Sequence, residues 1–184
     1  MQTKKLRKPL IGLAGRARSG KDTAAQVLID WHGYRKDSFA RPIREFVAGL
    51  CGITVEEMDP IKESPHPRLC GVSPRYAMQT LGTEWGRHTL AKNIWLEQCR
   101  ARIMDNAEEG VPTVITDVRF DNEADLIRAM GGTIIHVARP DALVVAAHVS
   151  EAGVTAQPFD IRILNDGSLD AFQHAVIRVY QDIR

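Results

Sequence analysis

Short apolar runs alternate along the chain with longer stretches whose apolar positions recur at helical spacing. The apolar runs are candidate strands and cover residues 10–14, 34–39, 111–117, 133–138 and 161–165. Runs that are apolar throughout are typical of parallel strands that helices cover on both faces. Because strands and helices alternate, the pattern predicts a layered α/β fold.

The helical stretches carry start and stop signals. Helices are expected at residues 21–31, from Pro42, from Pro74, at about 90–109 and at about 168–183. Thr54 and Glu57 form a capping-box pattern, which predicts one further short helical turn.

Two connections between the predicted strands are much longer than a compact α/β unit needs. They cover about residues 40–110 and 139–160, and insertions of this size at strand ends usually carry function. The sequence contains no repeat and no linker that would divide it. We therefore expect a single domain, residues 1–184, that carries two insertions.

Composition and charge narrow the class of protein. The formal net charge of +1 provides no basic field of the kind that accompanies duplex DNA binding, so no nucleic-acid partner is expected. The three cysteines form no CxxC pair, which indicates a reducing compartment. No apolar run approaches the roughly 20 residues that cross a bilayer. We expect a cytoplasmic protein without a membrane partner.

A glycine-rich loop between the first predicted strand and the first predicted helix carries the chemistry. It matches the GxxxxGK phosphate loop, in which backbone N–H groups and a helix N-terminus surround phosphates and the lysine supplies a cation. The matching residues are Gly15, Arg16, Ala17, Arg18, Ser19, Gly20 and Lys21. Arg16 and Arg18 either add charge beside the phosphates or are solvated surface residues.

The residue after the lysine departs from the usual pattern. Asp22 stands where Ser or Thr normally binds Mg²⁺ through its hydroxyl, and Thr23 follows it. A carboxylate is a good ligand for this hard cation. The hypothesis is that Asp22 takes the metal role and that Thr23 caps the helix.

A second acidic position ends the third predicted strand. Apolar residues lead to Asp117 in an arrangement like Walker B, where a carboxylate at the carboxyl edge of the sheet holds the metal's water shell. Arg119, two residues later, is placed to reach phosphates. Asp121 and Asn122 are expected to form the N-cap of the next helix.

A third stretch begins at Arg75. On a helix, Arg75, Gln79 and Thr83 share one face, which suits a phosphate and a base edge but equally describes an ordinary solvated face.

Four stretches together resemble the phage-type deoxynucleoside monophosphate kinases, within the P-loop nucleoside monophosphate kinase group. They are GRARSGKDT from Gly15, QTLGTEWGR from Gln79, TDVRFDNEA from Thr116 and HVSE from His148. The phosphate loop alone is shared by many NTPases, whereas LGTEWGR and DVRFDNEA are distinctive. The resemblance spans nearly the whole chain.

The resemblance implies a P-loop kinase fold with a five-stranded parallel sheet. The first insertion would bind the acceptor nucleotide and the second would form a lid. It implies that ATP, with Mg²⁺ at Asp22 and Asp117, donates its γ-phosphoryl group to a (deoxy)nucleoside monophosphate. Lys21, Arg119 and Arg139 would clamp the transferring phosphate. The turn Asn165-Asp166-Gly167 would border the ATP base, with Asn165 as its binding residue. The acceptor residues implied are Arg41, Arg75, Gln79, Thr83, Glu84 and Trp85.

Three alternatives share a phosphate loop. The chain could phosphorylate another small metabolite, such as dephospho-coenzyme A or phosphomevalonate. It could be an ATP-binding switch or motor subunit, although no obvious glutamine or glutamate stands ready to activate water. It could be a nucleic-acid-processing ATPase, which its near-neutral charge disfavours. The expected partners are small-molecule nucleotides, and the protein would be a monomer or a homodimer.

Overall fold

The computed structural model describes residues 9–140 and 153–183. Five parallel strands form one sheet in the order β2-β3-β1-β4-β5. The strands are β1 (Leu10–Ala14), β2 (Arg35–Asp37), β3 (Thr113–Val118), β4 (Thr133–Ala138) and β5 (Ile161–Leu164). The predicted α/β fold with a five-stranded parallel sheet flanked by helices is confirmed.

Seven α-helices, two 3₁₀ turns and one π-helix are described. They are α1 (Lys21–His32), α2 (Arg41–Cys51), α3 (Val55–Met58), η1 (Asp59–Ile61), η2 (Pro67–Leu69), α4 (Pro74–Thr80), the π-helix η3 (Leu81–Leu90), α5 (Ile94–Glu108), α6 (Asp121–Ala129) and α7 (Leu169–Ile183). The capping box predicted at Thr54 and Glu57 starts α3. No helix in the described ranges is both long enough and apolar enough to span a membrane.

The chain divides into two compact units. One unit combines Met1–Ser38 with Arg100–Arg184, and the other is Phe39–Cys99. The first, called the sheet unit here, holds the whole sheet with α1, α6 and α7. The second, the helical unit, holds α2, α3, α4 and η3. Helix α5 begins in the helical unit and ends in the sheet unit.

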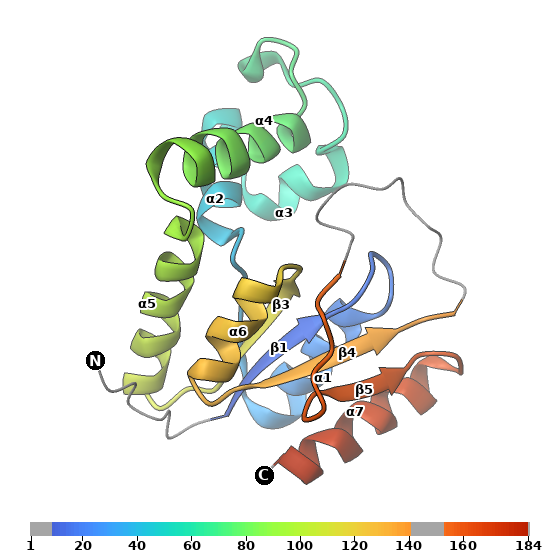
Figure 1. Cartoon of the computed structure of the whole chain (residues 1–184). Helices are drawn as coiled ribbons and strands as arrows, with labels where there is room; N and C mark the ends of the chain where they lie inside the picture. Colours follow the sequence, from blue (N-terminus) through green and yellow to red (C-terminus); the bar gives the residue numbers. More distant parts are fainter. Residues whose placement is uncertain (1–8, 141–152, 184) are drawn as a thin grey trace. The chain divides into compact units, whose positions relative to one another are not determined.

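Helices cover both faces of the sheet (Figure 1). Ile11 and Leu13 of β1 are completely buried in the cluster that α1 and α7 form on one face. Gly12 faces the other side, where a Cβ would come within 2.6 Å of Ile127 Cδ1 on α6. This alternation along β1 explains why the strand is apolar throughout.

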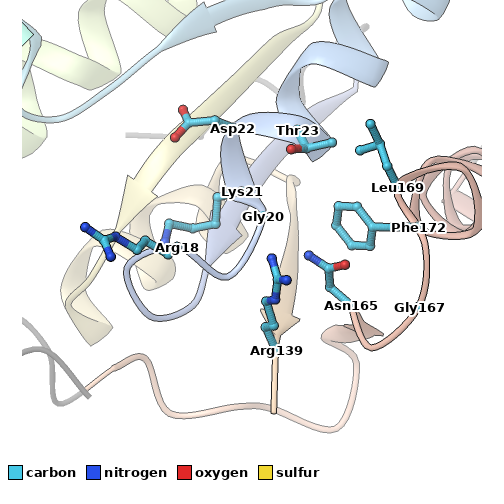
Figure 2. Close-up of a pocket in the computed structure, with 10 residues that line it drawn as sticks. All are labelled: Arg18, Gly20, Lys21, Asp22, Thr23, Arg139, Asn165, Gly167, Leu169 and Phe172. Carbon is cyan, nitrogen blue, oxygen red and sulfur yellow. The ribbon is translucent and has the colours of Figure 1, made fainter. Parts of the chain in front are cut away.

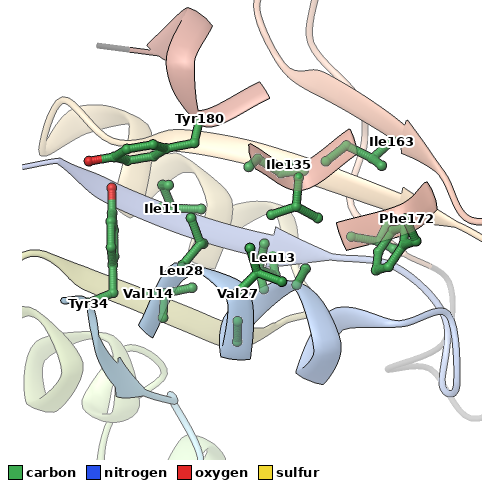
Figure 3. Packing of buried hydrophobic residues seen from close by; sticks show 14 residues of the cluster. Ile11, Leu13, Val27, Leu28, Tyr34, Val114, Ile135, Ile163, Phe172 and Tyr180 are labelled. Carbon is green, nitrogen blue, oxygen red and sulfur yellow. The ribbon is translucent and has the colours of Figure 1, made fainter. Parts of the chain in front are cut away.

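This cluster of buried apolar residues lies between the sheet and the helices α1 and α7 (Figure 3). Val27 and Leu28 of α1 and Phe172 of α7 pack against apolar residues of β1, β3, β4 and β5. Near the other end of α7, the rings of Tyr34 and Tyr180 meet edge to face with centroids 5.9 Å apart. Packing on α7 therefore connects the last helix of the chain to the first.

A buried ion pair fixes the end of β2. The Asp37 side chain is 1% exposed and accepts a hydrogen bond of 2.8 Å from Nε of Arg102 on α5. Nη2 of Arg102 donates to the other carboxylate oxygen and to the Ser38 carbonyl. Because the Arg102 guanidinium binds both oxygens of the Asp37 carboxylate and also the Ser38 carbonyl, it holds the side chain and the backbone that follows it. The carboxyl end of β2 is thus held in place beside the site.

A second buried carboxylate anchors the segment that precedes β5. Asp160 accepts hydrogen bonds from Arg128 of α6, from the Gln157 backbone and from the ring of His136 on β4. Burial alone would raise the pKa of Asp160, but these hydrogen bonds and the Arg128 charge hold it below its usual value. The same hydrogen bond raises the pKa of Arg128.

Replacing Asp160 by Asn should destabilise the protein in a pH-dependent way. At pH 7 the free energy of unfolding of the variant should be lower by about 3 kcal/mol, because Arg128 is left without its buried counter-charge. A lowered pKa means that this stability is present above the carboxyl's unfolded pKa, about 3.9, and is lost as pH falls through the folded value. Urea unfolding at a series of pH values from 7 down to about 2 measures how the difference in stability between the variant and the wild type changes.

Asp125→Asn is the matched control for this experiment. Asp125 also accepts a hydrogen bond from Arg128, but its side chain is 69% exposed, so its loss should cost less than about 1 kcal/mol. Equal losses of stability in the two variants would contradict the role of Asp160 as the buried counter-charge of Arg128. So would a loss in Asp160→Asn that stays the same as the pH falls.

Candidate functional site

The phosphate loop connects β1 to α1, as its sequence predicts. Gly15 has φ of 144° and Gly20 has φ of 110°, both in the left-handed region. A Cβ on Gly15 would lie 2.3 Å from the Val137 carbonyl oxygen. A Cβ on Gly20 would lie 2.6 Å from Asn165 Nδ2. Both glycines are therefore required by conformation and by space.

Arg18 is one of two described non-glycine residues with positive φ, at 62°. Such backbone strain concentrates at functional sites. Ser19 is 1% exposed, and its Oγ has no hydrogen-bond partner among the described residues. A buried hydroxyl without a partner carries a desolvation cost that a ligand can offset. Both features mark the loop as a site built for a ligand.

Lys21 folds back over the loop. Its Nζ donates hydrogen bonds of 2.7 Å to the carbonyl oxygens of Gly15 and Arg16. These bonds hold the ammonium at the N-terminus of α1, where the helix dipole also favours an anion.

A pocket of about 390 Å³ opens beside the loop. Figure 2 shows that its side chains come from the loop, the start of α1, the end of β4 and the start of α7. The lining residues are Arg18, Gly20, Lys21, Asp22, Thr23, Arg139, Asn165, Gly167, Leu169 and Phe172. Three cations and one carboxylate thus surround it, with an apolar wall on the α7 side.

Eight of the lining residues belong to the predicted site, counting Gly167 in the turn expected to border the ATP base, and two, Leu169 and Phe172, do not. Gly167, Leu169 and Phe172 follow β5, far from the loop in sequence. Asn165 contributes through structure as well, because its Nδ2 donates a 2.9 Å hydrogen bond to the Ser19 carbonyl. Phe172 lies against the position where Gly20 would carry a Cβ, 3.2 Å away. Only the contact itself, and no local pattern, identifies Phe172.

The end of β3 lies beside β1 in the sheet. Gly12 pairs with Ile115 and Ala14 with Val118, so β3 carries one extra residue in the stretch that contains Asp117. Irregularities of this kind often redirect side chains next to active sites. Asp117 and Arg119 are not among the residues that line the described pocket.

The predicted N-cap at Asp121 and Asn122 is wrong. Helix α6 begins at Asp121 itself, and Phe120 precedes it. Glu123, 2% exposed, supplies the cap by accepting hydrogen bonds from the backbone N–H groups of Arg119 and Phe120. Asp121 instead accepts from the backbone and hydroxyl of Thr155. Glu123 therefore fixes the turn that carries Arg119.

The predicted acceptor residues all belong to the helical unit. Arg41 at the start of α2 pairs with Glu45 at 2.7 Å, and Arg75 on α4 pairs with Glu63. Both pairs are about half exposed. Gln79, Thr83, Glu84 and Trp85 are exposed on α4 and η3.

The helix that carries Arg75, Gln79 and Thr83 changes type between Thr80 and Leu81, so Arg75 and Gln79 lie on α4 and Thr83 lies on η3. A π-helix follows, and π-helical segments occur frequently at functional sites. Trp95 Nε1 donates a 2.7 Å hydrogen bond to the Gly82 carbonyl. A Cβ on Gly86 would come within 2.5 Å of the Trp95 ring. Gly86 thus makes room for the indole, whereas a Cβ on Gly82 would meet Ile43 Cδ1 at 3.0 Å.

The stretch from His148 to Glu151 lies outside the described residues. In the described parts of the chain, no group of three or more His, Cys, Asp or Glu side chains is arranged for a metal ion.

A family model described as deoxynucleotide monophosphate kinase matches residues 53–176. A protein of Acanthamoeba polyphaga mimivirus, provisionally named a deoxynucleotide monophosphate kinase, is 35% identical over 183 residues, which cover 91% of this chain and 94% of that protein. The deoxynucleoside-5′-monophosphate kinase of Escherichia phage T5 is 27% identical over 242 residues, covering 93% and 94%.

Solved structures agree on the fold. A sugar kinase from Janibacter sp. HTCC2649 has a TM-score of 0.55 and 17% identity, covering 96% of this chain and 95% of that chain. A dephospho-CoA kinase from Campylobacter jejuni has a TM-score of 0.52 and 15% identity, covering 96% and 97%. At this identity the likeness shows a shared kinase fold alone.

Gly20→Ala should lower the affinity for ATP by about tenfold or more, since the new methyl collides with Asn165 and forces the loop to shift. Calorimetric titration with ATP and Mg²⁺ measures the change. Gly33→Ala is the control, because Gly33 also has positive φ, 67°, but nothing lies within 4 Å of its Cβ position. The control should lose about 1 kcal/mol of stability and no affinity. Similar affinities in both variants would contradict the role of Gly20.

Proposed function

Because the chain belongs to the deoxynucleotide monophosphate kinase family, we propose that it transfers the γ-phosphoryl group of ATP to a deoxynucleoside 5′-monophosphate. The products are ADP and the deoxynucleoside diphosphate. The observation that carries the proposal is the strained phosphate loop, with its Lys21 ammonium and a Ser19 hydroxyl that has no partner among the described residues.

The pocket beside the loop suits the donor nucleotide. Arg18 and Lys21 supply positive charge for the polyphosphate, and Leu169 and Phe172 supply apolar surface for the base. Arg139 follows β4 and lines the same pocket, so it is placed to clamp the transferring group. Backbone N–H groups of the loop carry most of the phosphate contacts in such sites.

The residues present fit a magnesium ion that arrives with ATP. Mg²⁺ is usually bound through one or two carboxylates, several waters and the phosphates of the substrate rather than by an all-protein cage. Asp22 at the start of α1 and Asp117 at the end of β3 are those two carboxylates in this proposal. When bound, the metal neutralises charge on the β- and γ-phosphates.

The acceptor is assigned to the helical unit. A monophosphate needs bidentate cations, and Arg41 and Arg75 are both held by carboxylates, Glu45 and Glu63. Such exposed pairs contribute little to stability, so a phosphate can replace either carboxylate at small cost. Gln79, Thr83, Glu84 and Trp85 would then contact the nucleoside.

Transfer between two phosphates requires no general base, since the acceptor oxygen is already anionic. Alignment and neutralisation of charge on the moving group carry the catalysis. Lys21, Arg119 and Arg139 supply that charge, and the region from about residue 139 to 160 is proposed to exclude water as a lid. The role of His148 and its neighbours stays a prediction.

The alternative kinase substrates receive less support. Dephospho-coenzyme A is favoured only by a fold likeness at 15% identity, whereas relatives named for deoxynucleotides align over more than nine-tenths of this chain. A cytoplasmic location and the choice between monomer and homodimer remain predictions.

A panel of acceptors tests the function. ADP formation from ATP and Mg²⁺ should require a deoxynucleoside monophosphate and should stay at background with dephospho-coenzyme A, phosphomevalonate or no acceptor.

Lys21→Met should lower kcat by about two decades, equivalent to about 3 kcal/mol of transition-state stabilisation. Lys92→Met, at an exposed lysine, serves as control. Rapid ATP hydrolysis without acceptor would instead favour a switch or motor ATPase.

Asp22→Ala tests the metal assignment. Turnover with Mg²⁺ should fall about tenfold or more, while ATP binding in EDTA should not weaken, because the carboxylate acts on the metal. Calorimetry in EDTA and steady-state kinetics across Mg²⁺ concentrations give the two values. Equal losses in both would remove Asp22 from the metal site.

A further inference from the structure

An ion pair links the second strand to the helix that follows the phosphate loop. Lys36 Nζ on β2 donates a 3.0 Å hydrogen bond to Asp22 Oδ1 in the first turn of α1. The side chains are 50% and 86% exposed. An ion pair this exposed adds little to folding stability, so stability does not explain its position.

Asp22 brings an electrostatic problem into the phosphate site. The usual residue after the phosphate-loop lysine is a neutral Ser or Thr, whereas Asp22 adds a negative charge at a helix N-terminus that must receive a polyphosphate. The Asp22 carboxylate and the phosphates of the nucleotide are both negative and repel each other. This repulsion is strongest before a metal ion has bound. A compensating cation is therefore needed near Asp22.

The position of Lys36 meets this need. Lys36 pairs in register with Val114 of β3, and the next residue, Asp37, is buried in the bidentate contact with Arg102. These contacts fix the backbone of β2 at the lysine and at the residue that follows it. The Lys36 ammonium uses Oδ1 of Asp22, and within the described residues Oδ2 has no hydrogen-bond partner. A water of a magnesium shell can therefore reach Asp22 without displacing Lys36.

We infer that Lys36 is a charge-balancing residue of the donor site, which neutralises Asp22 so that ATP can enter before or without the metal. The inference rests on the proposed function. It assigns to Lys36 a role in ATP binding that acts through Asp22 and not through direct contact with the phosphates.

A double-mutant cycle tests the inference by calorimetric ATP binding in EDTA. Lys36→Met should weaken ATP binding by about fivefold when Asp22 is present. In an Asp22→Asn background the loss should be less than about twofold, because no ion pair then holds the ammonium beside the phosphate loop. The loss should shrink at high salt, because both groups are exposed. Lys36→Arg should keep most of the affinity. Lys92→Met, the same substitution at an exposed lysine in the helical unit, should have no effect.

The outcomes separate the possible explanations. Equal losses in both backgrounds would mean that Lys36 contacts the phosphates directly, and no loss in either would make it an ordinary surface residue; both results overturn the inference and leave the kinase assignment intact. A wild-type protein that does not bind ATP would overturn both. Melting temperatures of all variants, expected within a few degrees of the wild type, exclude unfolding as the cause.

Discussion

Close packing around the phosphate loop is the constraint on which the rest of the site depends. The loop has no room for side chains at Gly15 and Gly20, because the Val137 carbonyl and the Asn165 amide occupy that space. Val137 belongs to β4, and Asn165 follows β5. Two strands and the start of α7 thus hold the backbone that must present its N–H groups to phosphate, and the sheet order determines which side chains surround the pocket.

In the proposed function, the donor and acceptor residues belong to different compact units. The sheet unit contains the pocket, its cations and the candidate metal carboxylates, and the helical unit contains the arginines assigned to the acceptor. The two units hold their charged side chains in different ways. The sheet unit uses buried pairs, such as Arg102 with Asp37 and Arg128 with Asp160. The helical unit holds Arg41 and Arg75 with exposed carboxylates that a phosphate can replace.

Local patterns predicted what depends on neighbours in sequence. The loop, the α/β layering and the capping box at Thr54 are all encoded within a few residues, and the structure contains all three. No local pattern predicted the π-helix, and its contact with the Trp95 indole, which bonds the Gly82 carbonyl thirteen residues earlier, is visible only in the fold. Phe172 and Leu169 join the pocket only through the fold. The predicted N-cap at Asp121 was wrong by one residue. Glu123, and not Asp121, accepts the hydrogen bonds from the backbone N–H groups of Arg119 and Phe120 at the start of the helix.

Calorimetric titration of the wild-type protein with ATP, in the presence of Mg²⁺, tests the central claim most directly. The structure predicts saturable binding at one site per chain, since one loop and one described pocket beside it are assigned to the donor. Folded protein that took up no nucleoside triphosphate at millimolar concentration would contradict the account at its base.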